Sequence, residues 1–302
     1  MTTPHREKLL KALKNPKCPA ADKKLLERAL VLYEEWVENM KNLSTKGQRR
    51  IVEMTELFNS YKYSLEVELI LSKGTPFIKR QRGQLKIGGS AIEEFFVHLF
   101  MSPIWESKEV EDLIGSSAFN VGHGRSFMSF YFNPPSLNEF QKRPFVRVKL
   151  KDQDFLFGKE IFYKFATSKD FPTEQVEEGS IMVPVVALEC KINFDKTMFQ
   201  EAAATAEKLK EGFPVAKYYV VTEFLDMRPE NLKITKVDNV FILRKAKRLS
   251  SDKRDKVSEV AEYYKNFPIS SKVIYKLVKE IEYFFSSEWF SEEKVLTRGS
   301  FI

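Results

Sequence analysis

The chain has 302 residues, a net charge of +7 and 43% apolar residues, and it contains 26 phenylalanines. This length and apolar content suffice for one large domain or two small ones with a sizeable core, so wholesale disorder is excluded. The excess of Lys and Arg suits a polyanionic partner such as nucleic acid, although on charge alone a solvated basic surface is the more ordinary explanation.

Two features bear on the cellular compartment. Cys18 and Cys190 are the only cysteines, and their spacing fits neither a disulfide framework nor a zinc site. The first residues lack the apolar stretch of a signal peptide, and the longest apolar runs, such as 95–101, are too short to span a bilayer. We therefore expect a soluble cytoplasmic protein without a membrane partner.

Residues 1–89 are expected to form a helical N-terminal region that ends in a basic loop. Apolar residues recur at helical spacing within 4–72, and the glycines and prolines of 73–89 then indicate a loop. This loop can contact the phosphate backbone and base edges of DNA, or it can be only a basic linker. We expect the region to serve in DNA contact or dimerisation. The candidate DNA-binding residues are Lys79, Arg80, Arg82, Gln84 and Lys86.

The segment Ser90-Ala-Ile-Glu93 has the pattern of a capping box in front of an apolar helix. Glu93 would then serve as part of the cap. Glu94, the next residue, would be free for another role.

From residue 125 the hydrophobic period changes to the alternation that is typical of strands. A glycine-rich turn is expected at 120–124, followed by strands at 126–132 and 145–157. A hairpin turn at Gly158-Lys159 would lead into a third strand at 160–166, and a polar loop would follow at 167–180.

The second half of the chain alternates between strands and helices. A strand followed by a helix and another strand indicates a parallel crossover, here beside an antiparallel hairpin. We therefore predict an α/β fold with a mixed β-sheet flanked by helices. The strands are expected at 183–191, 218–224 and 240–243, and the helices at 195–210, 256–264 and 271–285.

The segment Val183-Pro-Val-Val-Ala-Leu-Glu-Cys-Lys191 carries the clearest functional signal. In a strand, Glu189 and Lys191 point to the same side. A metal-dependent phosphodiesterase needs such a pair, because the acid can hold a divalent cation and the lysine can manage the attacking water. The same Glu/Asp-x-Lys spacing recurs in charged segments, but only this copy ends an apolar run. The alternative is an exposed cross-strand ion pair.

A second acidic ligand is expected because Mg²⁺ favours carboxylates, water and phosphate oxygens. Asp152 and Asp154 share strand parity, so alternation does not choose between them; we favour Asp154, since the apolar residues after it would anchor it at the sheet edge. Asp154 and Glu189 would hold one or two Mg²⁺ ions, and Lys191 would orient or help to deprotonate the water.

Three further carboxylates are candidates near this site. Glu94, or with less support Glu93, could ligate a second metal through water, and Glu201 could face the site from the following helix. Ordinary surface positions are the alternative for Glu94 and Glu201. For Asp154 the alternative is a residue of the hairpin turn.

The segment Asp152-Gln-Asp-Phe155 followed by residues 183–191 resembles the BbvCI-type type II restriction endonucleases, a branch of the PD-(D/E)XK nucleases. Gln153 stands where the usual proline of this motif is found. The similarity extends over about residues 90–302, and it also includes Ile92-Glu-Glu-Phe-Phe96, Ala204-Thr-Ala-Glu-Lys-Leu-Lys210, Tyr219-Val-Val-Thr-Glu223, Ile242-Leu-Arg244 and Arg298-Gly299.

This resemblance implies that residues 90–302 are a catalytic domain for Mg²⁺-dependent cleavage of double-stranded DNA. It implies a short recognition site akin to CCTNAGC, cut by a homodimer or by one of two homologous subunits in the bacterial cytoplasm. The competing hypotheses are a related nuclease of repair, transposition or junction resolution, and a non-catalytic DNA-binding module.

Overall fold

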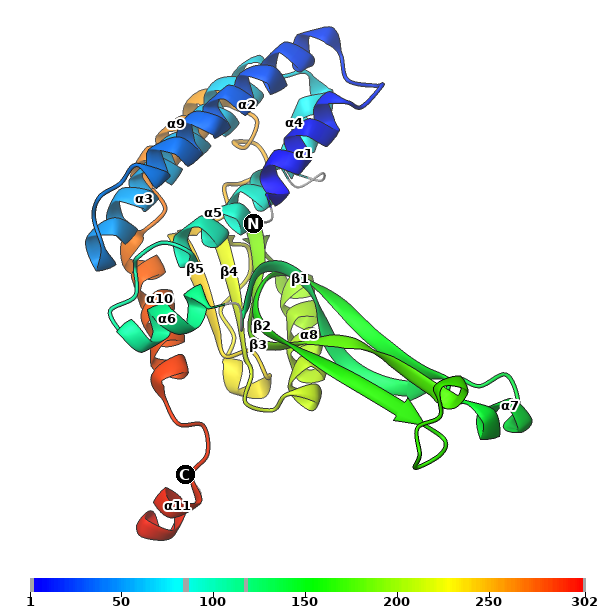
Figure 1. Cartoon of the computed structure of the whole chain (residues 1–302). Coiled ribbons are helices and arrows are strands. Elements are labelled where there is room, and N and C mark those ends of the chain that lie inside the picture. The colour runs from blue at the N-terminus through cyan, green and yellow to red at the C-terminus, as the bar shows by residue number, and fades with distance from the viewer. Residues whose placement is uncertain (1–2, 84–86, 117–118, 301–302) are drawn as a thin grey trace.

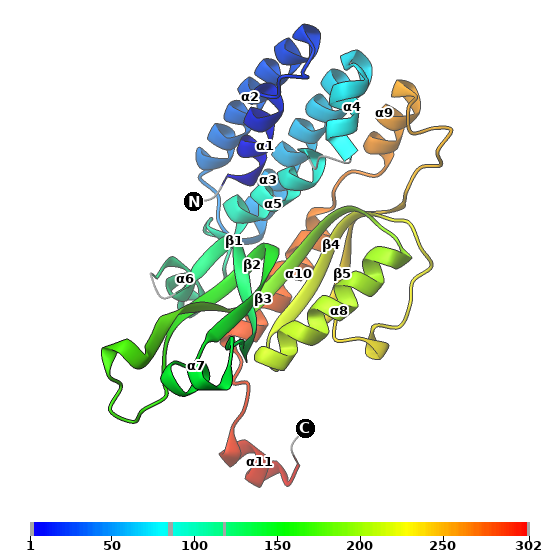
Figure 2. The same cartoon turned by 90° about the vertical axis from the view of Figure 1, so that its right-hand side faces the viewer.

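The computed structural model describes residues 3–83, 87–116 and 119–300, with the backbone alone for 81–83. A mixed five-stranded sheet in the order β1-β2-β3-β4-β5 lies between helices (Figures 1 and 2). The first three strands pair antiparallel, whereas β3, β4 and β5 run parallel. The predicted mixed α/β architecture is thus confirmed. The strands are β1 (Asn120–Phe132), β2 (Val146–Ala166), β3 (Val176–Phe194), β4 (Lys217–Leu225) and β5 (Asn239–Lys247).

Helices precede, connect and follow the strands. Within the described residues, no helix is long and apolar enough to cross a membrane. The α-helices are α1 (Pro4–Leu13), α2 (Ala20–Lys41), α3 (Gly47–Tyr63), α4 (Pro76–Gly83), α5 (Ile87–Phe100), α6 (Lys108–Gly115), α7 (Leu137–Lys142), α8 (Lys196–Gly212), α9 (Val257–Asn266), α10 (Ser271–Ser286) and α11 (Glu292–Arg298). A π-helix, η1 (Ser64–Leu71), continues α3, and short 3₁₀ turns occur at η2 (Thr173–Gln175) and η3 (Leu232–Ile234).

The alternation of β4 shows how the sheet separates two cores. Tyr218 and Val220 lie in one buried cluster with the alanines of α8. Tyr219 and Val221 point to the opposite face and join a larger cluster built with the N-terminal helices, α5 and α10. Successive strand residues point to opposite faces, so the apolar strand predicted at 218–224, which is buried on both faces, supplies both cores.

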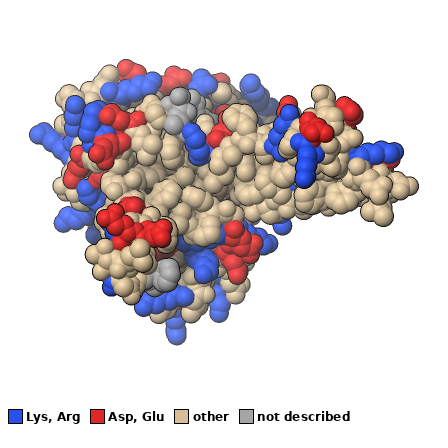
Figure 3. All heavy atoms as spheres, turned by 60° about the horizontal axis from the view of Figure 1, so that its bottom comes forward, with Lys and Arg blue, Asp and Glu red and all other residues tan. Residues whose placement is uncertain are grey.

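The strand β2 is 21 residues long and sharply bent. Its first half pairs with β1 and its second half with β3. At the far end the β1–β2 and β2–β3 hairpins meet again: the Val146 N–H of β2 donates a 2.7 Å hydrogen bond to Glu177 of β3, and the Phe130 ring of β1 lies 5.1 Å from those of Tyr163 and Phe165 of β2. The two hairpins and α7 thus form a two-layer arm, here called the β-arm, that projects from the body (Figures 1 and 3).

The hairpin turn predicted at Gly158-Lys159 is wrong, because β2 continues through it. Gly158 pairs with Pro184 beside a bulge. A Cβ at Gly158 would lie 2.7 Å from the sulfur of Met182 and 2.8 Å from the Leu156 side chain. Gly158 therefore allows these two side chains to approach the strand closely and makes no turn. The turn expected at 120–124 likewise belongs to β1, and β3 begins at Val176 within the expected loop 167–180.

The loop predicted at 73–89 is also wrong, because α4 and the first residues of α5 occupy most of it. The start of α4 is capped by Asp22 of α2, which accepts hydrogen bonds from the main-chain N–H groups of Thr75 (3.0 Å) and Ile78 (3.2 Å) and from the Thr75 hydroxyl. Such a cap from 53 residues away leaves no local signal. The helix α5 begins at Ile87, and Ser90 lies inside it and donates to the Ile87 carbonyl, so Ser90 is not the predicted N-cap.

The N-terminal helices are joined to the sheet by a buried network of charges. The Lys62 ammonium lies 2.5 Å from both Glu66 and Glu223. The Arg244 guanidinium contacts Glu223 at 2.7 Å and lies over the Tyr264 ring. These side chains come from α3, η1, β4, β5 and α9, and burying such charges requires that each is paired.

Candidate active site

The acid of β2 is tied to the Glu-x-Lys segment of β3. Phe155 pairs with Leu188, so Asp154 comes opposite Glu189 where the strand pairing ends. The Asp154 carboxylate accepts a hydrogen bond from the main-chain N–H of Cys190 at 2.8 Å. The Asp154 side chain therefore accepts the hydrogen bond of a β3 main-chain N–H at the point where the pairing of β2 with β3 ends.

Glu189 and Lys191 form a partly buried ion pair. Their charged atoms are 2.5 Å apart, and about one fifth of each side chain is exposed, 20% and 21%. Burial alone would lower the pKa of Lys191, but the carboxylates of Glu189 and Asp154 raise it above its ordinary value. The lysine is therefore held as a cation beside the two acids.

The second oxygen of Glu189 contacts a tyrosine that no sequence pattern indicates. The Tyr218 hydroxyl donates to Glu189 Oε2 at 3.2 Å. Burial, and then the negative charge of Glu189, raise the pKa of Tyr218 well above its ordinary value, so its hydroxyl remains protonated.

The structure separates Asp154 from Asp152. The Asp152 side chain is 74% exposed and lies 3.4 Å from Arg125 of β1. Asp154, in contrast, accepts the Cys190 N–H, and after burial its charge is the largest cause that raises the pKa of the Cys190 thiol. Asp154 and not Asp152 is thus brought to Glu189 and Lys191.

Glu94 is not brought to this group. It is fully buried and accepts hydrogen bonds from the main-chain N–H groups of His5 (2.8 Å) and Arg6 (3.2 Å) and from the Tyr33 hydroxyl. Burial would raise its pKa, but His98, 3.5 Å away, and Tyr33 lower it overall. Glu94 therefore fastens α1 and α2 to α5.

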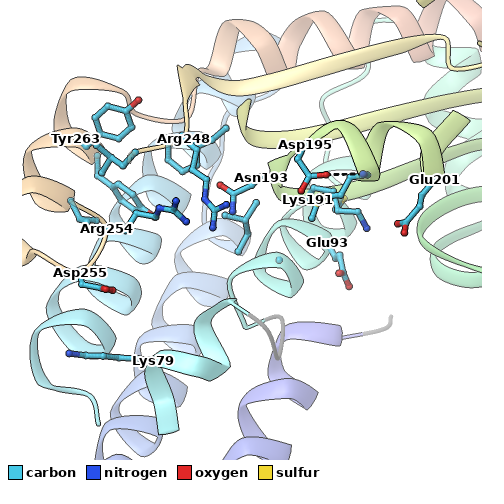
Figure 4. Close-up of a pocket in the computed structure, with 18 residues that line it drawn as sticks. Lys79, Glu93, Lys191, Asn193, Asp195, Glu201, Arg248, Arg254, Asp255 and Tyr263 are labelled. Carbon is cyan, nitrogen blue, oxygen red and sulfur yellow. Dashed lines mark hydrogen bonds between the residues drawn. The ribbon is translucent and has the colours of Figure 1, made fainter. Parts of the chain in front are cut away.

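Glu93 lies on the other side of α5 and lines a pocket of about 600 Å³ together with Lys191. Figure 4 shows Glu93, Lys191 and Glu201 directed into one end of this pocket, while Asp195 caps α8 through the Met198 N–H at 2.9 Å. Of the carboxylates named from the sequence, Glu93 and Glu201 thus border the same space as the lysine.

The other end of the pocket is basic. Lys79, Arg248 and Arg254 line it, and Figure 4 shows the two guanidinium groups turned toward each other. Arg248 contacts Asp226 at 2.8 Å, whereas the buried Nε of Arg254 has no hydrogen-bond partner among the described residues. These arginines belong to a basic cluster before α9, for which the sequence favours a solvated loop surface and leaves DNA contact as the alternative. Its members are Arg244, Lys245, Lys247, Arg248, Lys253 and Arg254.

The residues predicted to bind DNA fall in and after α4. Lys79 lines the pocket and Arg80 is exposed. The side chain of Arg82, and Gln84 and Lys86 entirely, lie outside the described residues. On the face that Figure 3 displays, Lys and Arg are interspersed with Asp and Glu rather than gathered in one large patch.

The donor set fits a hard cation that keeps part of its water shell. Asp154 and Glu189 supply carboxylate oxygens, which suit Mg²⁺ and not the softer metals. The described part of the chain contains no cluster of three or more His, Cys, Asp or Glu side chains placed to hold a metal ion. Two carboxylates nevertheless agree with Mg²⁺, which is commonly held by one or two carboxylates, water and substrate phosphate.

Comparison with known proteins identifies the fold and the family. A structure described as the native BbvCI A2B2 tetramer at low resolution is similar, with a TM-score of 0.65 and 16% identity over 94% of this chain and 98% of that chain. This likeness shows the fold. No curated protein matches the chain. The model of the family described as Bpu10I restriction endonuclease matches residues 84–301, most of the sequence, and the chain therefore belongs to the Bpu10I restriction endonuclease family.

Proposed function

We propose that the protein is a type II restriction endonuclease that makes Mg²⁺-dependent, sequence-specific cuts in double-stranded DNA. The observation that carries the proposal is the convergence of Asp154, Glu189 and Lys191, the last of which lines the pocket, in a chain of a restriction endonuclease family. We therefore keep Asp154, Glu189 and Lys191 as the proposed catalytic residues and Mg²⁺ as the proposed cofactor.

Asp154 and Glu189 are the residues that would hold Mg²⁺. When bound there, the ion would polarise the scissile phosphate and supply a more acidic water as nucleophile. Lys191 is placed to orient the water and to stabilise negative charge that develops on the phosphorus oxygens. Glu93, which borders the same space, takes the role of third acid that the sequence assigned first to Glu94.

The basic end of the pocket would receive a DNA backbone phosphate. Arg248 and Arg254 carry like charges that are turned toward each other, and an anion between them would relieve their repulsion (Figure 4). Within the described part of the chain, the N–H of the buried Arg254 Nε has no acceptor, and a phosphate oxygen would supply one. Because the same pocket holds Lys191, a bound phosphate there would keep the DNA strand next to the catalytic residues.

The enzyme would act with a second identical or homologous subunit in the bacterial cytoplasm. One group of Asp154, Glu189 and Lys191 can cut one strand, so cutting a duplex calls for two such groups. The similar structure is described as an A2B2 tetramer. Residues 1–89 would contribute DNA contact or dimerisation, and the site would be a short sequence akin to CCTNAGC.

Incubation with phage DNA and Mg²⁺, alone and with a co-expressed homologous subunit, tests this function. Discrete fragments, with ends mapped by sequencing, support the restriction enzyme and identify its site. Cutting only of branched DNA supports a repair or junction nuclease instead. Intact DNA under both conditions, with metal-independent binding, supports a non-catalytic DNA-binding module.

A further inference from the structure

Tyr218 is a fully buried residue whose hydroxyl ends at the candidate metal ligand Glu189. None of its side chain is exposed, and the oxygen-to-oxygen distance to Glu189 Oε2 is 3.2 Å. The other oxygen, Oε1, lies 2.5 Å from the Lys191 ammonium. Each oxygen of this carboxylate therefore has its own donor, one neutral and one charged.

The surroundings of Tyr218 fix the place of its hydroxyl. Its main-chain N–H donates to Asp238 at 2.8 Å, which anchors the beginning of β4. Its ring packs in the cluster that contains Ala202 and Ala206 of α8. Small side chains at these two positions leave room for a large ring between helix and sheet, so the hydroxyl is held by packing as well as by its hydrogen bond.

We propose that Tyr218 is a positioning residue that holds the Glu189 carboxylate in the orientation from which it ligates the cation. The proposal rests on the proposed function, because it assigns Glu189 to the metal. The terminal torsion of a glutamate is soft, so a carboxylate with Lys191 as its sole donor can rotate toward the ammonium. The Tyr218 hydroxyl opposes this rotation by holding Oε2.

A purely structural role makes a different prediction. Buried tyrosines generally find some partner for the hydroxyl, and removal of that partner changes stability alone. A positioning role instead changes the affinity for metal, since loss of a residue that orients a ligand typically lowers metal affinity about 10- to 100-fold.

The matched variants are Tyr218→Phe and Tyr219→Phe. Tyr219 is the next residue of β4 and is also buried, but it points to the opposite face. Each full-length protein is titrated with Mn²⁺ by calorimetry without DNA, and cleavage is measured against Mg²⁺ concentration. For Tyr218→Phe we expect a Mn²⁺ dissociation constant raised about 10- to 100-fold and a parallel shift in the Mg²⁺ requirement. The Mn²⁺ dissociation constant of Tyr219→Phe should stay within about twofold of that of the unmodified chain, a difference in binding free energy below RT.

The two proposals fail in different ways. An unmodified protein that binds Mn²⁺ and cleaves DNA, with a Tyr218→Phe variant of unchanged Mn²⁺ affinity, overturns the positioning role alone. An unmodified protein that cleaves no DNA with its partner present overturns the proposed function. Combining Tyr218→Phe with Glu189→Gln provides a further check, because the two effects on Mn²⁺ affinity should not add if both act through one carboxylate.

Discussion

Glu93 and Glu94 are neighbours on α5 but face different surroundings. Glu93 lines the pocket that contains Lys191, whereas Glu94 is fully buried among main-chain N–H groups of α1 and the side chains of Tyr33 and His98. One residue step on a helix turns a side chain by about 100°. The helix thus presents one carboxylate to the candidate active site and uses the other for folding.

The variants Glu93→Gln and Glu94→Gln should therefore differ. Glu94→Gln removes the charge that accepts several hydrogen bonds, and we expect it to lower the free energy of unfolding by about 2 kcal/mol. Glu93→Gln should leave the melting temperature nearly unchanged but reduce cleavage about tenfold at limiting Mg²⁺. Thermal unfolding and cleavage rates measure both. Loss of cleavage from Glu94→Gln in a protein still fully folded would contradict the assignment.

Asp154→Asn should reduce cleavage below detection, because it removes one of the two carboxylates proposed to hold the cation. Asp152→Asn is the control, since Asp152 is largely exposed and its contact with Arg125 is worth at most about 1 kcal/mol. Both are measured by plasmid cleavage with Mg²⁺. An inactive Asp152→Asn beside an active Asp154→Asn would reverse the choice of ligand.

Lys191→Ala should lower the cleavage rate by at least about a hundredfold while Ca²⁺-supported DNA binding stays nearly intact. The lysine is expected to act on the attacking water and the developing charge rather than on the bound duplex. Lys208→Ala, at an exposed position of α8, serves as the control. Cleavage and gel-shift assays on the same preparations separate the two effects. A Lys191→Ala enzyme that cuts at the normal rate would show that the site is misassigned.

Arg254→Ala should weaken binding of DNA in Ca²⁺ and reduce its dependence on salt. Loss of one phosphate contact lowers the slope of log K against log salt concentration by about one unit. The neighbouring Lys253 is paired with Glu259 at 3.5 Å and does not line the pocket, so Lys253→Ala is the control. An unchanged slope for Arg254→Ala, measured by fluorescence anisotropy, would argue against a phosphate at this end.

The stability of the protein should fall as the pH decreases from about 6.5 to 4. Burial lowers the pKa of His5 to about 4, against 6.5 for an ordinary histidine. In this interval the unfolded chain takes up a proton that folded His5 does not, so unfolding is favoured by up to about 3 kcal/mol. Denaturant unfolding of the normal chain and of His5→Gln at pH 7 and pH 4.5 measures the difference. An equal decrease in both proteins would exclude His5 as the cause.

The parallel half of the fold could be predicted because its signals are local. Asp195 caps α8, and apolar runs mark β3 and β4. The antiparallel half could not be predicted, because a glycine at position 158 indicates a turn in the sequence. In the structure Gly158 lies within β2, close to the Met182 side chain. The helix α4 was missed for a similar reason, since its cap, Asp22, is supplied by a distant helix.

The candidate site shows the same division. The pair Glu189 and Lys191 is visible in the sequence because one strand carries both. The choice of Asp154 over Asp152 depends on where the pairing of β2 with β3 ends. Both residues point to the same side of the strand, so their positions in the sequence do not show which of them lies at that end. Tyr218 carries no signal at all, because its contact with Glu189 arises only when neighbouring strands pair.

The charge network around Lys62 has a consequence for exchanging parts between relatives. A chimera that took its first 89 residues from another protein would keep Glu223 and Arg244 but could lose Lys62 and Glu66. The chimera would then enclose Glu223 and Arg244 without the charged groups that had been removed with the replaced segment. Recombinants that join near residue 89 should accordingly be recovered only when all four positions are inherited as a set.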